Sequence, residues 1–457
     1  MRFKLLKLLF TGEIASDSSY LKRIAVILLI GLLIRLIFMP ISAHNDFLSE
    51  HIRVEYILYG GNPFAVAGQF LSHYIDAAFL FLFTPFIPDH GEIFKLPSQT
   101  GLASTVENEP FIRFIDSPNS YRALFLLKLP YLISDFLCFF MLLRLISDKK
   151  RAFWLACFWM FNPISIYAIY IYGRYEIYGL LLLIASLLLC KKDRPYLSCF
   201  MLGLAIASRS YLLMLLPLFP LLISRKWNIR IVSLALAVAP TVVYSLMSNM
   251  LGTGSFFYKT APATNVIEAL VEGGFIGLGL MPRLEIGQYH VYLLIFALTL
   301  IYIWTLHMKE DGLSSVIRGS SLIIFSYFLL APFSAHWFFW TVPWLALFLA
   351  ESKESRWAAW AIPAVWFIHS ALYSDWSVFT FYLFSPINPQ YFMSSSSLSQ
   401  VISSLTQNMG SGVKDILSPE TLLGVMRSIL SGMIFYTILK MIKGKSSETQ
   451  LKMKGGG

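Results

Sequence analysis

One aspartate stands just beyond the first long apolar segment of the chain, where a membrane-spanning helix would meet water. Asp46 is the first acid after that segment, which covers residues 21–40. A carboxylate at such a boundary can act as a general base that takes a proton from a hydroxyl group. The structural alternative is that Asp46 only stabilises the positive end of a helix dipole. We predict Asp46 as the candidate catalytic residue.

The residues around Asp46 have the pattern of a helix that lies on a membrane surface. An apolar stripe recurs at helical spacing through Leu48, Ile52, Tyr56 and Tyr59. Asp46, Glu50 and Arg53 fall on the opposite face. We therefore expect an interfacial helix with its apolar side down and its acids facing outward. Turn residues at 60–63 end it.

Two arginines in apolar surroundings are candidates for binding an anion, because a charge at mid-membrane costs about 2.5 to 3.5 kcal/mol. Arg174, followed closely by Glu176, could bind a lipid phosphate through a fork of charge-assisted hydrogen bonds. The alternative is an interfacial ion pair. Arg209 stands between two serines at the tip of an apolar hairpin, and it needs an anion as well. Asp135 within an earlier span is its alternative internal partner.

An aromatic run opens with His336 and Trp337 and continues to residue 340. Aromatic rings stack on the faces of sugars, so both residues are further site candidates. Aromatic belts also mark every membrane interface. Because aromatic residues make up 16% of the chain, this structural reading is the stronger of the two.

Several classes of chemistry are missing from the sequence. It has no glycine-rich phosphate loop, no His/Cys metal cluster and no Ser-His-Asp spacing of a hydrolase. Cys138, Cys157, Cys190 and Cys199 suit neither a metal site nor a disulfide framework. We therefore expect no cofactor, and a divalent metal would lack a recognisable motif. A substrate would have to arrive from the lipid phase already activated.

The composition indicates a membrane protein with many spans. Hydrophobic residues make up 57% of the chain and charged residues only 14%, against about 25% charged in soluble domains. The net charge of +10 does not indicate nucleic-acid binding, because lysines and arginines on the cytoplasmic side of a membrane explain it.

Apolar segments of about 20 residues predict an all-α, polytopic transmembrane bundle of about 10 to 12 spans, including a short hairpin. The expected segments are 21–40, 121–146, 152–171, 178–190, the hairpin 196–223, 231–250, 289–307, 320–335, 337–350, 357–373 and 422–442. This topology places every dense Lys/Arg cluster inside.

We expect a single domain over residues 1–443, followed by a disordered cytoplasmic tail at 444–457. Three long loops would lie outside. The first, 44–120, carries interfacial helices and a second apolar piece at 70–88 that is interfacial or re-entrant; the others are 251–288 and 374–420.

Five short segments follow one another in a distinctive order. They are Asp46 with the turn Gly61-Asn62-Pro63-Phe64, KLPYLISDFL at 128–137, FNPISIYAIYIYGRYEIYG at 161–179, SRSYLLMLLP at 208–217 and AHWFFWTVPWL at 335–345. Together they resemble the GT-C superfamily of integral-membrane glycosyltransferases. Within it, the chain resembles the mannosyltransferases that use polyprenyl- or dolichyl-phosphate sugars, in particular the glycosylphosphatidylinositol mannosyltransferase I-like members.

The resemblance implies an enzyme that transfers mannose, or another hexose or pentose, from a lipid-phosphate donor with inversion. Asp46 would be the base, Arg174 and Arg209 would bind the donor phosphate, and the other site candidates are Glu50, Glu176, His336 and Trp337. The acceptor would be a glycan, a lipid or a protein, as in cell-envelope glycan assembly. The site would face outside the inner membrane of a prokaryote, or the lumen of the endoplasmic reticulum.

The alternative function is a transporter or a flippase for lipid-linked sugars. Arg209 and Asp135 would then line a path through the membrane. Transporters usually show repeat symmetry and broken helices in both halves, and this sequence has no internal repeat that we can identify.

Overall fold

Long apolar segments must fold as helices in a membrane, because no water is present there to satisfy the backbone. The computed structural model describes residues 18–60, 63–65, 69–94, 108–146, 148–251, 281–286, 289–307, 312–351, 353–373 and 379–443. Helices account for nearly all regular structure in these ranges. The predicted all-α, polytopic fold is confirmed.

The first half of the chain builds the elements that surround Asp46 and Arg174. They are α3 (Ser18–Ile41), α4 (Asn45–Tyr59), η1 (Pro63–Ala65), α5 (Phe70–Phe83), η2 (Thr84–Phe86), α6 (His90–Ile93), α7 (Asn108–Asp116), α8 (Ser120–Leu145), α9 (Lys149–Phe161), α10 (Pro163–Ser165), η3 (Ile166–Ile171), α11 (Glu176–Lys191), α12 (Pro195–Ser208), η4 (Ser210–Leu215), α13 (Leu218–Ile223) and α14 (Trp227–Leu251).

The second half closes the bundle. Its elements are β1 (Arg283–Ile286), β2 (Tyr289–Tyr292), α17 (Leu293–Leu306), α18 (Leu313–Leu330), η5 (Ala335–Thr341), α19 (Val342–Glu351), α20 (Lys353–Tyr373), η6 (Phe381–Phe384), α21 (Pro389–Phe392), α22 (Leu398–Thr406), α23 (Ser411–Ile416) and α24 (Pro419–Lys443).

Six helices in the described ranges are long and apolar enough to cross a membrane. They cover Ser19–Ile41, Ser120–Leu145, Lys149–Ile171, Trp227–Ser248, Leu313–Leu330 and Ser411–Lys443. Shorter apolar helices lie at Phe70–Phe86, Pro195–Ser208, Leu293–Leu306 and Ala335–Leu349. The predicted hairpin at 196–223 takes the form of α12, η4 and α13, with Arg209 between α12 and η4.

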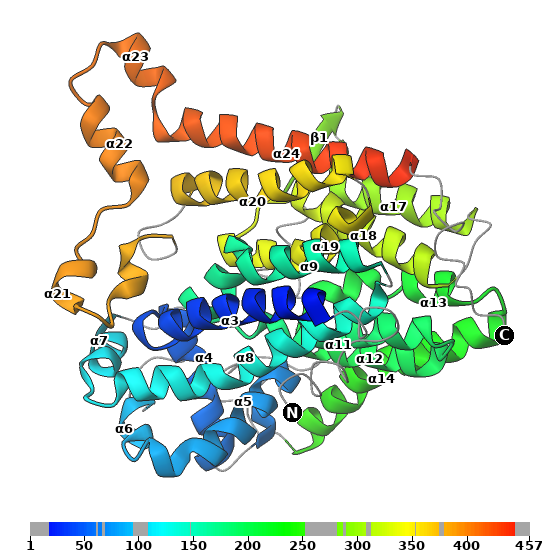
Figure 1. Ribbon diagram of the computed structural model, residues 1–457, viewed down its shortest axis with the longest axis horizontal. Coiled ribbons are helices and arrows are strands. Elements are labelled where there is room, and N and C mark those ends of the chain that lie inside the picture. Colours follow the sequence, from blue (N-terminus) through cyan, green and yellow to red (C-terminus); the bar gives the residue numbers. More distant parts are fainter. Residues whose placement is uncertain are drawn as a thin grey trace.

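The long helices run side by side, and short helices gather at one end of them. Figure 1 shows α3, α8, α20 and α24 extending across the view, with α4, α6, α7 and α21 to α23 at the left. Most of the described short helices of 44–120 and 374–420 therefore share this end of the bundle, whereas α5 lies nearer its middle. That the end faces outside stays a prediction. The predicted tail 444–457 and residues 252–280 of the predicted outer loop lie outside the described residues.

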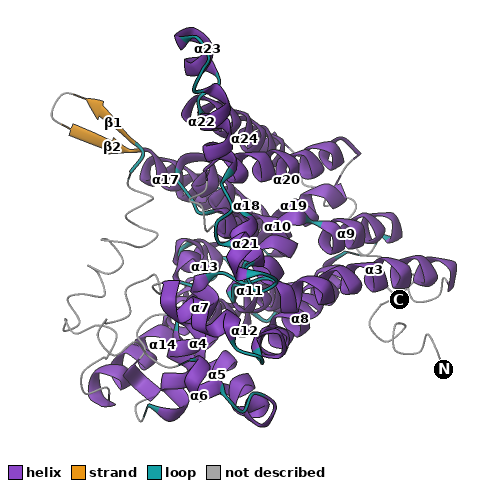
Figure 2. Ribbon diagram, turned by 90° about the vertical axis from the view of Figure 1, so that its left-hand side faces the viewer, coloured by secondary structure: helices purple, strands orange, loops and turns teal. Residues whose placement is uncertain are grey.

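One predicted span begins later than expected. The segment 289–307 was predicted as a single helix, but Tyr289–Tyr292 forms strand β2, and α17 begins only at Leu293. Tyr289, Val291 and Tyr292 are aromatic or β-branched, which favours a strand. Residues 289–292 pair antiparallel with β1, with Ile286 opposite Tyr289. Figure 2 shows this hairpin projecting from the helices.

A buried ion pair joins α3, α8 and α9. Arg35 Nε donates to Asp135 Oδ2 at 2.6 Å, and neither side chain is exposed. Trp159 Nε1 and Tyr170 Oη also donate to Asp135, at 2.7 and 2.8 Å. The prediction of Asp135 as the partner of Arg209 is therefore wrong. Asp135 is already paired, because α8 packs on α3 rather than on the tip of the hairpin.

Candidate active site

Helix α4 directs Asp46 inward and not outward. His44 caps the helix, since its Nδ1 accepts a hydrogen bond from the Asp46 backbone N–H at 3.0 Å. The carboxylate of Asp46 is therefore free to reach another element. Leu48 and Ile52 are buried, as expected for an apolar stripe, but so is Glu50. The prediction that the acids of α4 face outward is wrong, because a second charged segment lies against them.

That second segment is the turn at residues 172–176, which follows the π-helix η3. Gly173 has φ +85°, and a Cβ there would lie 2.9 Å from the Phe47 ring, so only glycine fits. Lys128 Nζ donates to the carbonyls of Ser42 and Tyr170, at 2.5 and 2.7 Å. This fully buried lysine thus links the residues just before α4 to the end of η3.

Asp46 and Arg174 meet between these two segments. Arg174 Nη1 donates to Asp46 Oδ2 at 3.0 Å, and Tyr172 Oη donates to the same oxygen at 3.1 Å. Burial raises the pKa of Asp46, but Arg174, His44 and His336 together outweigh it, so that the pKa lies below its ordinary value. Asp46 is therefore ionised near neutral pH.

Glu50 extends the cluster one turn along α4. Its carboxylate lies 3.1 Å from Arg53 Nη1, 3.2 Å from His73 Nε2 and 3.7 Å from Arg174 Nη1. Burial raises the pKa of Glu50, but Arg53, His73 and Arg174 together lower it to about 2. Glu50 is thus a fixed negative charge behind Arg174.

Glu176 joins the two predicted phosphate-binding arginines. Arg174 Nε lies 3.4 Å from Glu176 Oε1, and Arg209 Nη2 donates to the same oxygen. Arg209 Nη1 also donates to Gln69 and, at 3.0 Å, to Tyr175 Oη. The tip of the α12–η4 hairpin therefore lies against the start of α11.

A stack of three rings forms one wall of the cluster. The His44 and Tyr172 rings lie 4.1 Å apart at 16°, and the Tyr172 and His336 rings 4.4 Å apart at 24°. His336 Nε2 lies 4.0 Å from Glu176 Oε1. Trp337 packs edge-on against Tyr211 at 5.0 Å, and so lies at the margin. Burial lowers the pKa of His44 to about 4, which leaves His44 neutral near pH 7.

Several buried atoms of the cluster have no protein hydrogen-bond partner in the part of the chain that the structure describes. They are His44 Nε2, Glu176 Oε2, Arg209 Nε and His336 Nε2. A buried polar atom left without a partner costs about 1 to 3 kcal/mol, so such atoms are expected to meet water or a ligand. Both donors and acceptors are available here for a polar ligand.

The structure thus brings every predicted site residue into one neighbourhood, with Trp337 at its edge. His44, Tyr172 and His73 also belong to this neighbourhood, although the sequence did not predict them as site residues. A weak signal existed for His73, which interrupts the apolar segment 70–88. Tyr172 carried none, because tyrosines are frequent throughout the chain. In the described ranges, no group of three His, Cys, Asp or Glu side chains is placed to hold a metal ion.

Comparison with known proteins bears on the central part of the chain. Residues 110–332, just under half of the sequence, match the model of glycosyltransferase family 87. The matched range contains Arg174, Glu176 and Arg209, whereas Asp46, Glu50 and the 336–337 pair lie outside it. No curated protein matches the chain. The likeness to glycosylphosphatidylinositol mannosyltransferase I stays a prediction. With its six candidate spans, this match supports a membrane protein with glycosyltransferase activity.

Proposed function

We propose that the protein transfers a sugar from a polyprenyl- or dolichyl-phosphate donor to an acceptor hydroxyl, with inversion, on the outer face of the membrane. One observation carries this proposal. Asp46 on α4 meets Arg174, and Glu176 joins Arg174 to Arg209 of the α12–η4 hairpin. Helix α4 is one of the short helices towards the left of the bundle in Figure 1. Mannose is the sugar that the resemblance of the motifs favours.

Each group then has a defined role. Asp46 accepts the proton of the acceptor hydroxyl while that oxygen attacks the anomeric carbon. The bond from this carbon to the donor phosphate breaks as the new one forms, and the lipid phosphate leaves with the electron pair. Arg174 and Arg209 hold the charge that develops on the phosphate. A positioned general base contributes typically about 10² to 10⁴-fold in rate.

The charges of the cluster explain how a phosphate can enter it. The acids Asp46, Glu50 and Glu176 already balance the arginines Arg53, Arg174 and Arg209 in their salt bridges. An added anion must therefore displace one carboxylate from its guanidinium group. The side chains of Asp46, Glu50 and Glu176 are 20%, 6% and 1% exposed. Asp46 is the most exposed of the three acids, so its displacement needs the least rearrangement.

We infer that the donor phosphate takes the place of Asp46 on Arg174. Removing the positive partner raises the proton affinity of a carboxylate, so Asp46 becomes a stronger base once the donor is bound. Donor would then bind before the acceptor is deprotonated. Premature deprotonation of water would be disfavoured in the free enzyme, where Arg174 holds Asp46.

Sugar transfer by the purified full-length protein in lipid nanodiscs tests the function. The donors are radiolabelled polyprenyl-phosphate mannose, glucose and arabinose, and label that leaves the donor is followed in the presence of octyl glycosides and mannotriose as acceptors. We expect transfer from at least one donor, with inverted configuration in the product. In a parallel experiment with the protein in sealed proteoliposomes, donor label that crosses the membrane without transfer would instead indicate a flippase.

The described residues do not form the route through the membrane that the transporter alternative requires. It required Arg209 and Asp135 to line one route, whereas Asp135 is paired with Arg35 and Arg209 with Glu176. We therefore do not favour it.

A further inference from the structure

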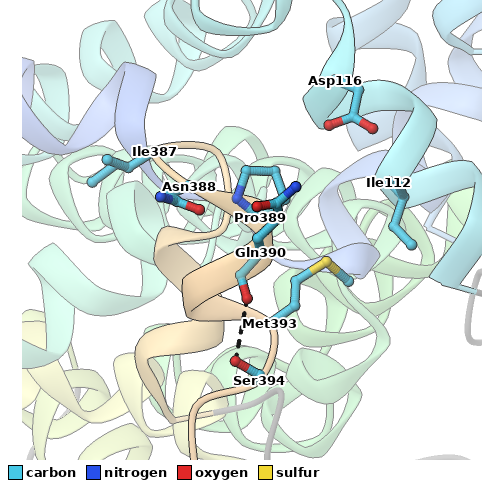
Figure 3. A pocket seen from close by; sticks show the side chains of 8 residues that line it. All are labelled: Ile112, Asp116, Ile387, Asn388, Pro389, Gln390, Met393 and Ser394. Carbon is cyan, nitrogen blue, oxygen red and sulfur yellow. Dashed lines mark hydrogen bonds between the residues drawn. The ribbon is translucent and has the colours of Figure 1, made fainter.

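A pocket of about 700 Å³ lies at the end of the bundle that carries α7 and α21. Ile112 and Asp116 of α7 form one wall, and residues 387–390, 393 and 394 form the other, as Figure 3 shows. It is an open hollow and not an enclosed cavity, since Ile112 and Ile387 on its two walls remain 38% and 47% exposed. None of its lining residues belongs to the charged cluster around Asp46, so it needs an explanation of its own.

Both walls of the pocket are anchored next to Asp46. The buried Tyr382, which precedes the second wall in sequence, donates its hydroxyl to the side chain of Asn45. The backbone N–H of Ala43 donates to Leu383 O at 2.9 Å. The Tyr382 ring also stacks on Phe111 of α7 at 5.5 Å. The pocket is therefore built on the loop that leads into Asp46.

The lining has the chemistry of a carbohydrate site. Asp116 offers a carboxylate and Gln390 an amide. The Asn388 Oδ1 accepts from the Tyr391 N–H at 3.1 Å, which leaves its NH₂ group to donate. Ser394 Oγ donates to Gln390 O at 3.2 Å and keeps its lone pairs as acceptors. Carboxylates and amides of this kind form paired hydrogen bonds with neighbouring hydroxyl groups of a sugar.

Apolar side chains complete the lining. Ile112 and Met393 face the same pocket and can cover the C–H face of a pyranose ring. A hydrocarbon chain fits less well, because it would take the carboxylate and the amides out of water without offering them hydrogen bonds. The combination of a few polar groups with apolar ones is the usual composition of a ligand site.

We propose that this pocket binds the saccharide part of the acceptor and holds the acceptor so that its reactive hydroxyl reaches Asp46. The proposal rests on the function proposed above, because it assigns the second substrate of the same reaction. It identifies that substrate as a carbohydrate, as opposed to a hydroxyl group on a protein or an unglycosylated lipid.

Direct binding of saccharides by the full-length protein tests the pocket without any need for turnover. The probes are mannotriose and cellotriose, observed by saturation-transfer NMR with the protein in nanodiscs. The variants are Asp116→Asn, Gln390→Ala and Asn388→Ser; serine preserves the cap of α21 but removes the amide. Gln407→Ala, an exposed amide directly after α22 that does not line the pocket, is the matched control.

We expect at least one trisaccharide to bind, a weakening of about tenfold or more in Asp116→Asn, and no change in Gln407→Ala. In transfer assays the same variants should raise the acceptor KM and leave the donor KM unchanged. Failure of both trisaccharides to bind, equal binding by all variants, or displacement of the trisaccharide by dodecanol would overturn the proposal. Binding without transfer from any donor would contradict the proposed function and leave the pocket intact.

Discussion

In the described part of the chain, the arginine–carboxylate arrangements around Asp135 and around Asp46 differ in how fully their hydrogen bonds are satisfied. Around Asp135, both carboxylate oxygens accept hydrogen bonds, and Arg35 also donates to the carbonyls of Gly31, Trp159 and Met160. Around Asp46, the carboxylate is 20% exposed, and atoms of neighbouring residues have no protein partner within the described ranges. The first arrangement is closed and the second is open.

The difference separates a structural role from a functional one. A buried pair with every hydrogen bond made has nothing left to offer a ligand, and removing one partner leaves an uncompensated charge. A cluster with balanced charge but unused donors and acceptors can exchange one partner for another. The Asp135 site therefore holds α3, α8, α9 and η3 together, and the Asp46 site is the place where an anionic substrate can compete.

The largest effect is expected from removing the carboxylate charge at the open site. Asp46→Asn should lower sugar transfer by about 10² to 10⁴-fold and leave the thermal unfolding temperature close to wild type, since Arg174 keeps Glu50 and Glu176. Glu420→Gln, at the start of α24, serves as the control. Full activity in Asp46→Asn would remove this residue as the base.

The closed site should respond in the opposite manner. Asp135→Asn should destabilise the protein by about 3 to 5 kcal/mol, because Arg35 is left buried without a counter-charge. The protein that remains folded should retain its activity per molecule. Thermal unfolding in detergent, together with activity normalised to the folded fraction, checks this. Normal stability with lost activity would show that the two sites do not differ as described.

Replacing an arginine by lysine keeps the charge and tests the fork. Arg209→Lys removes the Nε donor and the planar geometry that suits phosphate, so the donor KM should rise by about tenfold, equivalent to 1.4 kcal/mol. Arg122→Lys, on the exposed start of α8, is the control. An unchanged donor KM in Arg209→Lys would mean that Arg209 does not contact the donor.

The pH dependence tests the displacement of Asp46. In the free enzyme Arg174 keeps the pKa of Asp46 below its ordinary value, so kcat/KM for the donor should fall only in strong acid. In the donor complex the phosphate occupies Arg174, so the pKa of Asp46 is higher, and the acid limb of kcat should lie at higher pH. Arg174→Gln should move the limb of kcat/KM upward in the same way. Identical limbs in both profiles would contradict the displacement.

Four other groups also face Asp46, namely His44, Tyr172, Glu50 and His336. They are present both in the free enzyme and in the donor complex. Their effects on the pH profile therefore cancel to a first approximation.

The smallest effect concerns the ring stack. His336→Phe keeps a ring against Tyr172 but removes the nitrogen that lies near Glu176. We expect transfer to fall only about two- to tenfold, the equivalent of one ordinary hydrogen bond. His336→Ala should cost more, since it also removes the stacking contact. Equal losses in the two variants would show that only the ring nitrogen matters and that the stacking contact contributes nothing.

Much of the fold could be read from the sequence because burial in a membrane demands long apolar helices. The hairpin with Arg209 at its tip and the helix that starts beside Asp46 are local features, set by residues close together in the chain. The strand at 289–292 was missed, since its apolar residues continue directly into the apolar helix α17.

The sequence by itself identified charged residues in or beside apolar segments, where a charge is costly, and Asp46, Arg174 and Arg209 are among them. Only the tertiary structure decided their partners. It paired Asp135 with Arg35 and Arg209 with Glu176, and it turned Glu50 into the interior. The physical reason is that the cost of burying a charge can be judged from the residue and its apolar neighbours in the sequence. The identity of the partner that offsets this cost depends on which helices pack together.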